Sequence, residues 1–352
     1  MNRRELLYSL GGLWALQACR PLDLLTQAPS EGPWFYSGVS LPGKTYGIGA
    51  TWSSEGRVYP VKNVIHSVVY DDESKLKVFL PKSGAEAYYQ TGENPLKTFH
   101  PAEGNYFYGH GAFDLKRNVF YTTQSAVTAD GPNEERMYNK GFIYVHSMDD
   151  FRIINKFSTS GNDPHDLRIV GDEIVVCNGG HLSNVSFINP DSGKVSQSFP
   201  LNDEMLSAGH IEMLDSENFV IVTGSYRQHY PPAIYSLNRE TGLKKFPIPE
   251  GLDPLFRVQL LSVVNYRNLI LATCPQTDSL FVWDKDGKFF GAHQIKKAAS
   301  LAVTHELGGV IVGSDLDSEP LRLISFDAGQ MKVKALDWGP RNTGSHALVI
   351  PG

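Results

Sequence analysis

One stretch decides the fold: Tyr106-Phe107-Tyr108-Gly109-His110-Gly111-Ala112-Phe113-Asp114. A degenerate copy of its second half recurs along the whole chain, and in most copies a histidine opens a short apolar segment of strand character. The copies that keep the histidine begin at His66, His110, His165, His210 and His346. Two further copies keep the apolar segment but have Gln259 and Ser300 at the position of the histidine.

The spacing between successive copies is 44, 55, 45, 49, 41 and 46 residues. A period in the forties is typical of β-propellers, in which each repeat is one four-stranded blade. The composition agrees, because 33 glycines, 21 prolines and 20% charged residues in 352 indicate short strands joined by many turns. We therefore predict an all-β fold, a seven-bladed β-propeller of the YVTN or WD type.

The two ends of the propeller are expected to meet in the first blade. Its amino-terminal part supplies only three strands, at about residues 34–39, 44–51 and 57–61, so residues 345–350 would supply the innermost strand. This pairing would close the ring and leave no open sheet edge. The innermost strand of the sixth blade is predicted at residues 258–264.

The amino terminus is expected to be an export signal. Arg3 and Arg4 precede an apolar run, Leu6 to Ala18, that is too short to span a bilayer as a stable helix. The paired arginines resemble a twin-arginine export motif, and ordinary secretion stays open. Leu16-Gln17-Ala18-Cys19 resembles a bacterial lipobox, in which the cysteine thiol is lipidated.

These features predict a signal peptide at residues 1–18, a lipidated tether at 19–33 and the propeller at 34–352. The protein would then be anchored by lipid on the periplasmic side of the bacterial envelope. Arg20, rather than an aspartate, follows Cys19, which resembles outer-membrane sorting. We expect a monomer.

Charge and motifs narrow the possible functions. The formal net charge is −6 and no Lys/Arg-rich run occurs, which argues against nucleic acid as the partner. The sequence has no nucleophile elbow, phosphate loop, dinucleotide fingerprint or CxxCH motif. Cys177 and Cys274 fall in non-adjacent blades and cannot approach to the roughly 7 Å between Cα atoms that a disulfide needs, so we expect two buried free thiols.

The five histidines would all enter the inner strands from one face, around the central channel. Imidazole suits iron, copper or zinc, so they are candidate metal or ligand-binding residues, with iron or copper as the possible cofactor. The alternative is a structural role. Tryptophan-aspartate repeat propellers place a Gly-His pair in this link as a hydrogen-bond anchor, and Gly109-His110 and Gly209-His210 are similar. Both interpretations stay open.

The same face would carry the long links between second and third strands, where functional groups concentrate. Asp166 and Glu212 follow histidines closely and are candidates to fix an imidazole tautomer. Arg168, Arg227 and Arg257 are candidates for an anion-binding rim at the channel mouth. Simple salt bridging is the alternative for these charges. The link residues Asn178, His181 and His229 complete the candidate rim, and Asn178 with Glu212 could imitate the metal site of a lactonase propeller.

Three segments together resemble an exported bacterial family known as domain of unknown function 1513. They are Phe107-Tyr108-Gly109-His110-Gly111, Gly161-Asn162-Asp163-Pro164-His165-Asp166-Leu167-Arg168 and Val175-Val176-Cys177-Asn178-Gly179-Gly180. The resemblance implies a seven-bladed propeller encoded beside imelysin-type proteins linked to iron uptake, and hence an imelysin-type partner. The link after Gly180 is shorter than is usual in the family, and the segment 124–140 is longer.

Three hypotheses follow. The first is a non-catalytic binding protein for a metal ion or a metal-handling partner in envelope iron uptake. The second is a metal-dependent oxidoreductase or hydrolase that uses the same face. The third is a protein-binding scaffold in which the histidines only anchor strands.

Overall fold

The computed structural model describes residues 32–41, 45–53, 55–126, 140–227, 229–316, 318–327, 330–338 and 346–351. The expected signal peptide, the lipidation site Cys19 and residues 19–31 of the expected tether lie outside these ranges. Residues Pro33–Pro351 form one compact unit. Within the described ranges, no helix has the length and apolar character needed to cross a membrane.

Among the described residues, the unit is built from antiparallel strands and two short 3₁₀ helices, η2 (Asp253–Leu255) and η3 (Pro275–Thr277). In the part of the chain that is described, the strands form five four-stranded sheets and one eight-stranded sheet. The first sheet has the order β28 (Leu348–Ile350), β1 (Trp34–Leu41), β2 (Thr45–Trp52) and β3 (Glu55–Val61). The eight-stranded sheet joins two groups of four, which are β4 (Ile65–Asp71), β5 (Leu76–Gly84), β6 (Ala87–Thr91) and β7 (Lys97–Phe99), and β8 (Asn105–Asp114), β9 (Val119–Ala126), β10 (Lys140–Ser147) and β11 (Ile153–Asn162).

The remaining sheets each run in sequence order from the innermost strand outward. They are β12 (Pro164–Val170), β13 (Glu173–Asn178), β14 (Asn184–Asn189) and β15 (Lys194–Pro200); β16 (Leu206–Met213), β17 (Asn218–Ser225), β18 (Ile234–Asn238) and β19 (Gly242–Lys245); β20 (Val263–Tyr266), β21 (Leu269–Cys274), β22 (Ser279–Asp284) and β23 (Phe289–Gln294); and β24 (Ala298–Thr304), β25 (Gly309–Ser314), β26 (Leu321–Asp327) and β27 (Gln330–Leu336).

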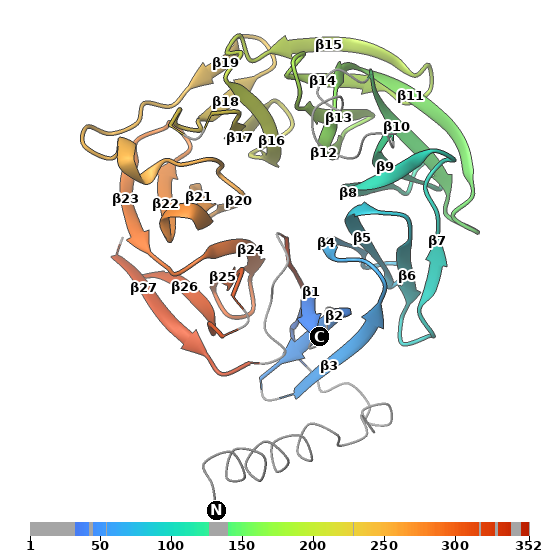
Figure 1. The fold of residues 1–352 in the computed structure, drawn as a ribbon, viewed down its shortest axis with the longest axis horizontal. Coiled ribbons are helices and arrows are strands. Elements are labelled where there is room, and N and C mark those ends of the chain that lie inside the picture. Colours follow the sequence, from blue (N-terminus) through green and yellow to red (C-terminus); the bar gives the residue numbers. More distant parts are fainter. Residues whose placement is uncertain are drawn as a thin grey trace, which may run out of the picture. The chain divides into compact units, whose positions relative to one another are not determined.

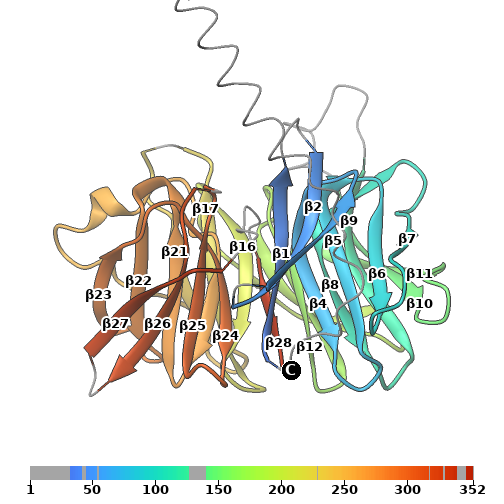
Figure 2. The same cartoon turned by 90° about the horizontal axis from the view of Figure 1, so that it is seen from below.

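The sheets stand radially about a common centre, with β4, β8, β12, β16, β20 and β24 nearest to it (Figure 1). Seen from the side, β28 lies beside β1 (Figure 2), and the two pair antiparallel with Trp34 opposite Ile350. The first sheet thus takes its inner strand from the carboxyl-terminal part of the chain. The predicted all-β, propeller-like fold is confirmed.

The core lies between neighbouring sheets. Val175, Cys177 and Phe187 of one sheet pack against Ile211 and Phe219 of the next. Both faces of a middle strand are covered in this arrangement, which is why these strands read as continuous apolar runs rather than alternating ones. Outer strands such as β15 alternate instead between partly buried and exposed residues. Cys177 and Cys274 are buried free thiols, as predicted.

The hairpins between third and fourth strands recur with the same chemistry. Gly193, Gly242 and Gly287 have φ values of 64°, 85° and 85°, a region that favours glycine. The side-chain oxygens of Asn189 and Asn238 each accept hydrogen bonds from backbone N–H groups two and three residues further on. These Asx turns fix the register of the outer two strands in successive sheets.

The inner strand of the sheet β20–β23 is shorter than predicted, because it begins at Val263 rather than at Val258. The preceding segment pairs with β17 of the neighbouring sheet instead. Gln259 forms an isolated antiparallel bridge with Gly224, and the backbone N–H of Leu260 donates to the oxygen of Thr223 at 3.0 Å. Local apolar character predicted the strand but could not show which neighbour it would pair with.

Candidate functional site

The five histidine side chains that recur in the sequence converge at the centre of the sheets. The Nε2 atom of His66 lies 3.1 Å from Nε2 of His110, and that of His165 lies 3.0 Å from Nε2 of His210. His346 Nε2 lies 2.8 Å from the same His210 atom. One nitrogen from each of His66, His110, His165 and His210 lies within 4.8 Å of all the others. We call these five residues the histidine cluster.

The inner strands are irregular where they present these histidines. The pairing of β4 with β5 shifts register between Ile65 and Ser67, and that of β12 with β13 shifts between Pro164 and Asp166. Similar shifts occur beside the histidines of β8 and β16. A bulge of this kind re-aims a side chain that would otherwise follow the alternation of the strand. Four inner strands use the same local device to direct an imidazole to the centre.

Gly109 is required by the packing of the cluster. Its φ of 105° lies in the region that disfavours side chains, and a Cβ added there would lie 2.3 Å from Cδ2 of His66. The backbone of β8 therefore passes directly against the His66 ring. This contact explains why glycine precedes His110.

The donor set fits a transition-metal ion. Metal–nitrogen bonds of about 2.0–2.1 Å place two imidazole nitrogens at right angles about 3.0 Å apart, close to the three Nε2 separations given above. His210 Nε2 lies near both His165 and His346, while its Nδ1 is buried without a hydrogen-bond partner among the residues that the structure describes. A neutral imidazole has one donor and one acceptor, so neither tautomer satisfies all these contacts. A metal ion would accept the lone pairs that face one another.

Burial keeps most of the cluster uncharged. It lowers the pKa of His66, His165, His210 and His346 well below the ordinary value, and the neighbouring imidazoles lower it further. The positive charge of Lys82 adds to this effect on the pKa of His66, His165 and His346. The neutral imidazole is the form that binds a metal, so these groups need not lose a proton at neutral pH to do so.

Asp166 contacts His110 at the ring nitrogen that faces away from the other imidazoles. Its Oδ1 lies 3.1 Å from His110 Nδ1 and 2.5 Å from the guanidinium of Arg168, and its Oδ2 accepts from the backbone N–H of Ile211 at 3.1 Å. Although burial opposes ionisation, Arg168 and His110 hold the pKa of the Asp166 carboxyl well below its usual range. An ionised Asp166 favours the proton on His110 Nδ1, which leaves the Nε2 lone pair for the cluster.

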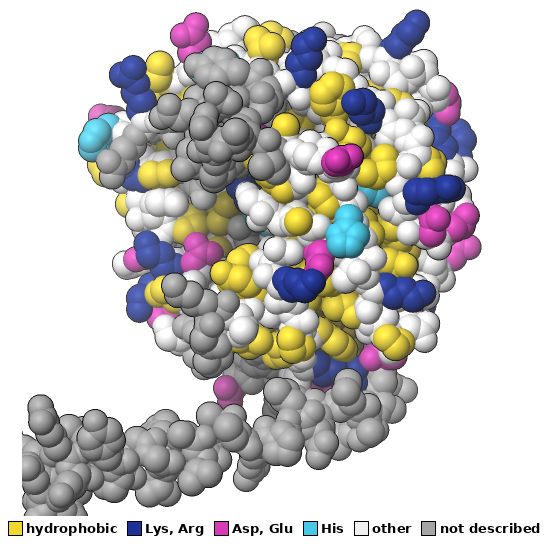
Figure 3. All heavy atoms as spheres, turned by 45° about the vertical axis from the view of Figure 1, so that its right-hand side comes forward, with side chains coloured by type: hydrophobic (Ala, Val, Ile, Leu, Met, Phe, Trp, Pro, Cys, Tyr) yellow, Lys and Arg dark blue, Asp and Glu magenta, His cyan; other side chains and the backbone are white. Residues whose placement is uncertain are grey.

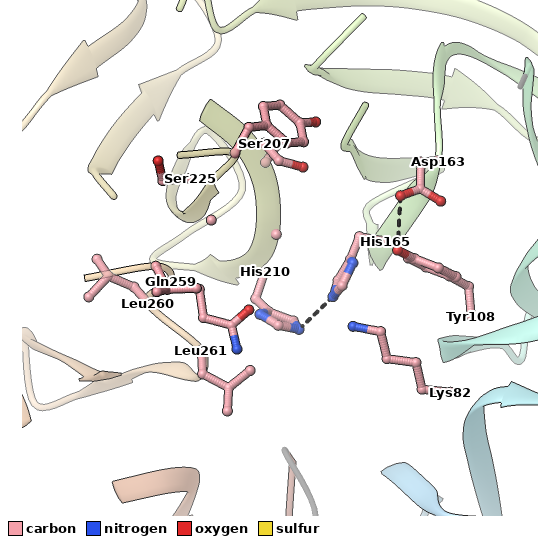
Figure 4. A pocket seen from close by; sticks show the side chains of 15 residues that line it. Lys82, Tyr108, Asp163, His165, Ser207, His210, Ser225, Gln259, Leu260 and Leu261 are labelled. Carbon is pink, nitrogen blue, oxygen red and sulfur yellow. Dashed lines mark hydrogen bonds between the residues drawn. The ribbon is translucent and has the colours of Figure 1, made fainter. Parts of the chain in front are cut away.

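Two cavities border the cluster. One of about 370 Å³ reaches His165 and His210 and is lined by Lys82, Tyr108 and Gln259, among others (Figure 4). Another of about 560 Å³ reaches His110 and His346 from the other ends of the inner strands.

Glu212 and Arg168 line the larger cavity. Burial raises the pKa of Glu212 to about 7, against the opposing effect of the Arg168 charge, and Glu212 accepts a hydrogen bond of 3.3 Å from the backbone N–H of Asn265. Both side chains therefore face the channel from the side away from the long links.

The three arginines do not form the single rim that the sequence suggested. Arg168 binds Asp166, as described. Arg257 donates to the backbone oxygens of Asp253 and Phe256, and so secures η2. Arg227 is exposed in the link after β17. Spacing alone could not show that Arg168 points to the opposite end of the channel.

The link residues also lie apart from the cluster. Asn178 is fully buried and its amide donates to Asn184 Oδ1 at 2.8 Å, so it lines neither cavity and does not join Glu212 in a shared site. His181 is exposed and stacks on Tyr226 with ring centroids 6.3 Å apart. His229 is exposed as well.

Sequence reasoning missed Lys82 and the cavity role of Tyr108. Lys82 reaches the centre because β5 continues beyond its own group and pairs with β8, which sets Lys82 opposite Tyr108. Its amino group lies 5.4 Å from the centre of the Tyr108 ring. No sequence motif predicts this long-range pairing of β5 with β8. Gln259, by contrast, was recognised from the sequence as the residue that replaces a histidine.

The outer surface carries mixed charge on the face shown in Figure 3. Among its described residues, basic and acidic side chains are interspersed with apolar atoms rather than gathered into one patch. Such a face gives no electrostatic preference for a strongly charged partner.

Solved structures with a similar fold include a gluconolactonase, a hydrazine synthase and a WD40 domain. The periplasmic gluconolactonase PpgL of Pseudomonas aeruginosa aligns with a TM-score of 0.65 at 11% identity, over 91% of this chain and 99% of that chain. Hydrazine synthase of Kuenenia stuttgartiensis aligns at 0.61 and 10% identity, over 89% and 98%. The WD40 β-propeller domain of Doa1 aligns at 0.54 and 15% identity, over 82% and 93%. At these identities the likeness shows the fold alone.

In the comparison with curated proteins, none matches this chain. One family model matches residues 60–339, which covers most of the propeller-like unit and all of the histidine cluster except His346. The chain therefore belongs to the family described as protein of unknown function (DUF1513).

Proposed function

We propose that this protein binds one divalent transition-metal ion through His66, His110, His165 and His210, with His346 as a fifth donor. One observation carries the proposal: imidazole nitrogens from four separate inner strands, β4, β8, β12 and β16, lie within 4.8 Å of one another. Structural anchoring would not require their rings to meet, and burying several imidazoles together is costly unless something satisfies them.

The ion belongs to the group that prefers nitrogen donors. Imidazole suits copper, zinc, nickel and iron, and affinity in such sites usually rises towards copper. The resemblance noted from the sequence points instead to iron. We therefore propose copper(II) or iron(II) as the resident ion, to be decided by direct titration.

The site sits in the channel of what we propose is a closed seven-bladed ring. Seven groups of four strands support this proposal, as does the pairing of β28 with β1, which links the carboxyl-terminal strand to the first group. In such a ring the innermost strand of each blade lines one central channel, and each of these strands has an equivalent position at its start. Five of these positions carry histidine.

The cellular setting proposed here rests on sequence motifs. Arg3 and Arg4 with Leu16-Gln17-Ala18-Cys19 support export and lipid anchoring on the periplasmic side, with the outer membrane favoured. The protein would act there as a metal-binding partner of an imelysin-type protein in iron uptake. Radioactive palmitate incorporation that a Cys19→Ser variant abolishes would test the anchor.

A titration tests the metal site. The protein from residue 20 onward is stripped of metal and titrated with Cu²⁺ and, under anaerobic conditions, Fe²⁺, with bound metal measured by mass spectrometry and affinity by calorimetry. We expect one ion per chain and nitrogen hyperfine structure in the copper electron paramagnetic resonance spectrum. The double variant H110A/H165A should lose at least about 100-fold in affinity, because two of the donors are removed.

The matched control is H181A/H229A, which removes two exposed histidines away from the channel. It should bind metal as the parent protein does. Equal binding by both double variants, or no stoichiometric binding by the parent, would rule out the proposed centre.

One observation favours a metal-dependent enzyme as the second candidate. The 370 Å³ cavity beside His165 and His210 is large enough for a small molecule, since ligand pockets typically have volumes of about 300–1,000 Å³. A lactonase-like site built from Asn178 and Glu212 is not that candidate, because the two side chains are not brought together.

A further inference from the structure

The histidine cluster is incomplete on one side. Five strand groups contribute a histidine, whereas Gln259 and Ser300 stand at the equivalent sequence positions of the other two. A metal bound by the cluster would be least enclosed by protein donors towards these two positions. An exogenous ligand would approach from there.

The backbone near Gln259 creates space on that side. Val258 has a φ of 60°, which is strained for a β-branched residue. Two hydrogen bonds to β17 hold this strained backbone in place. The backbone N–H of Ser225 in β17 donates to the oxygen of Val258, and the N–H of Leu260 donates to the oxygen of Thr223 in β17. The segment is thereby drawn out of the inner-strand position of its own sheet, and the 370 Å³ cavity lies beside it.

Polar groups around this cavity point inward. Figure 4 shows the Lys82 amino group and the Gln259 amide directed towards the His165–His210 pair. Tyr108 donates a hydrogen bond of 2.9 Å to Asp163 Oδ2, which engages the one acidic side chain that lines the cavity among the described residues. The wall thus presents the Lys82 cation and the Gln259 amide to the same space, together with the Asp163 carboxylate that Tyr108 binds.

The charges that face the 370 Å³ cavity determine which ligand it would bind. A divalent ion in the cluster and the Lys82 ammonium would both face the cavity, and two like charges repel unless an anion lies between them. Carboxylates are suited to bridge such a pair, because one oxygen can bind a metal while the other accepts a charge-assisted hydrogen bond. The volume limits the occupant to a small molecule.

From this geometry we infer that the cavity beside His165 and His210 is a binding site for a small organic carboxylate, held between the metal and Lys82 and contacted by Gln259. The inference rests on the proposed metal centre and names the ligand class that this centre would take. With such a ligand, the metal centre would bind and release small molecules from the cavity instead of serving only as a buried structural site.

Acetate and acetamide are the probes, because they have the same shape but differ in charge. Copper-loaded protein from residue 20 onward is titrated with each, and the copper absorption and paramagnetic resonance spectra are followed. We expect a saturable spectral shift with acetate and none with acetamide. K82M should weaken acetate binding at least about tenfold, while copper affinity stays unchanged or rises because a repelling charge is removed.

The control variant is K97M. Lys97 is also an exposed lysine over a tyrosine ring, with its amino group 5.8 Å from the Tyr89 ring centre, but it lines neither of the channel cavities. It should bind acetate like the parent. Q259A should weaken acetate binding by a smaller factor than K82M and leave copper binding intact.

The outcomes separate the two proposals. Stoichiometric copper binding without any acetate response, or equal acetate affinity in K82M and K97M, would overturn the carboxylate site alone. Absence of copper binding would overturn the metal centre and this inference together. A shift of equal size with acetamide would show that charge does not select the ligand, and would overturn the inference as well.

Discussion

At the scale of single residues, the candidate site depends on close contacts between a few side chains. Gly109 passes against the His66 ring, Asp166 holds His110, and His210 meets two further imidazoles. Each contact fixes a ring orientation. Small changes here should therefore affect ligand geometry before they affect the fold.

Gly109→Ala tests this expectation. The added Cβ would lie 2.3 Å from the His66 ring at a φ of 105°, so His66 must move. We expect the metal affinity to fall at least about tenfold, as for changes to groups that orient ligands, and the free energy of unfolding to fall by more than the roughly 1 kcal/mol that positive φ alone costs. Copper titration and urea unfolding measure the two effects.

Gly104→Ala is the control for backbone strain. Gly104 also has a positive φ, of 75°, but an added Cβ would meet no atom within 4 Å. This variant should lose about 1 kcal/mol of stability and keep its metal affinity. If the two variants bound metal equally well, the contact between Gly109 and His66 would have no role in shaping the cluster.

The sequence identified the five histidines that converge, because each opens an apolar segment at a regular interval. It could not identify Lys82, whose position depends on an extension of β5 pairing with β8. It also grouped Arg168 with Arg227 and Arg257, although the direction of Arg168 follows from the register of β12, which no local pattern reveals. Whether the cluster binds metal stays a prediction.

At the scale of secondary-structure elements, polar side chains secure the hairpins from within the sheets. His146 in β10 is fully buried, and its Nδ1 lies 2.9 Å from the oxygen of Phe151 in the link to β11. Its Nε2 lies 3.0 Å from the Thr122 hydroxyl of β9. One imidazole thus joins two strands and a turn.

This histidine should make the protein sensitive to acid. Burial lowers the pKa of His146 to about 4, so between that pH and the ordinary value of about 6.5 the unfolded chain binds a proton that the folded chain does not. Stability is unaffected above pH 6.5 and falls as the pH drops towards 4, by up to about 3 kcal/mol from this group.

His146→Asn should remove that part of the acid sensitivity. The Asn amide can still donate towards Phe151 but does not titrate. Urea unfolding of metal-free protein at pH 7 and pH 4.5 should show a smaller loss for H146N than for the parent. An identical loss in both proteins would mean that His146 does not titrate as its burial implies.

Most elements were predictable because strand pairs repeat with the same turns. The exception is the inner strand expected at residues 258–264, where the prediction was wrong because the segment pairs with a strand of the neighbouring sheet. Backbone groups of this segment found partners in β17, and the strained Val258 marks the departure. Apolar periodicity predicts which residues are buried but not which strand they pair with. It therefore cannot distinguish pairing within the same sheet from pairing with the neighbouring one.

At the scale of the whole molecule, the cluster joins parts of the chain that are distant in sequence. Its histidines come from β4, β8, β12 and β16 and, for His346, from two residues before β28. An ion held there would connect separate strand groups across the channel. Its binding free energy would therefore stabilise the assembled sheets as a unit.

Metal removal should lower the thermal stability of the parent protein. At a free ion concentration 100 times the dissociation constant, binding contributes about 2.7 kcal/mol, and a chain of this size gains at least about 3 °C in Tm from it. Calorimetry with Cu²⁺ and after chelation measures the difference. H110A/H165A should show no such difference, whereas a full shift in that variant would place the ion elsewhere.

The position of His346 has a consequence for biogenesis. Its backbone N–H donates to the oxygen of His66 at 3.0 Å, and its ring meets His210, yet it follows His66 by most of the length of the chain. A nascent or truncated polypeptide that stops short of this residue lacks one donor and the hydrogen bond that seats it. Such a chain would keep four of the five imidazoles, so it should bind the proposed ion less tightly than a chain that includes His346, and the metal affinity would report whether synthesis has passed the last repeat.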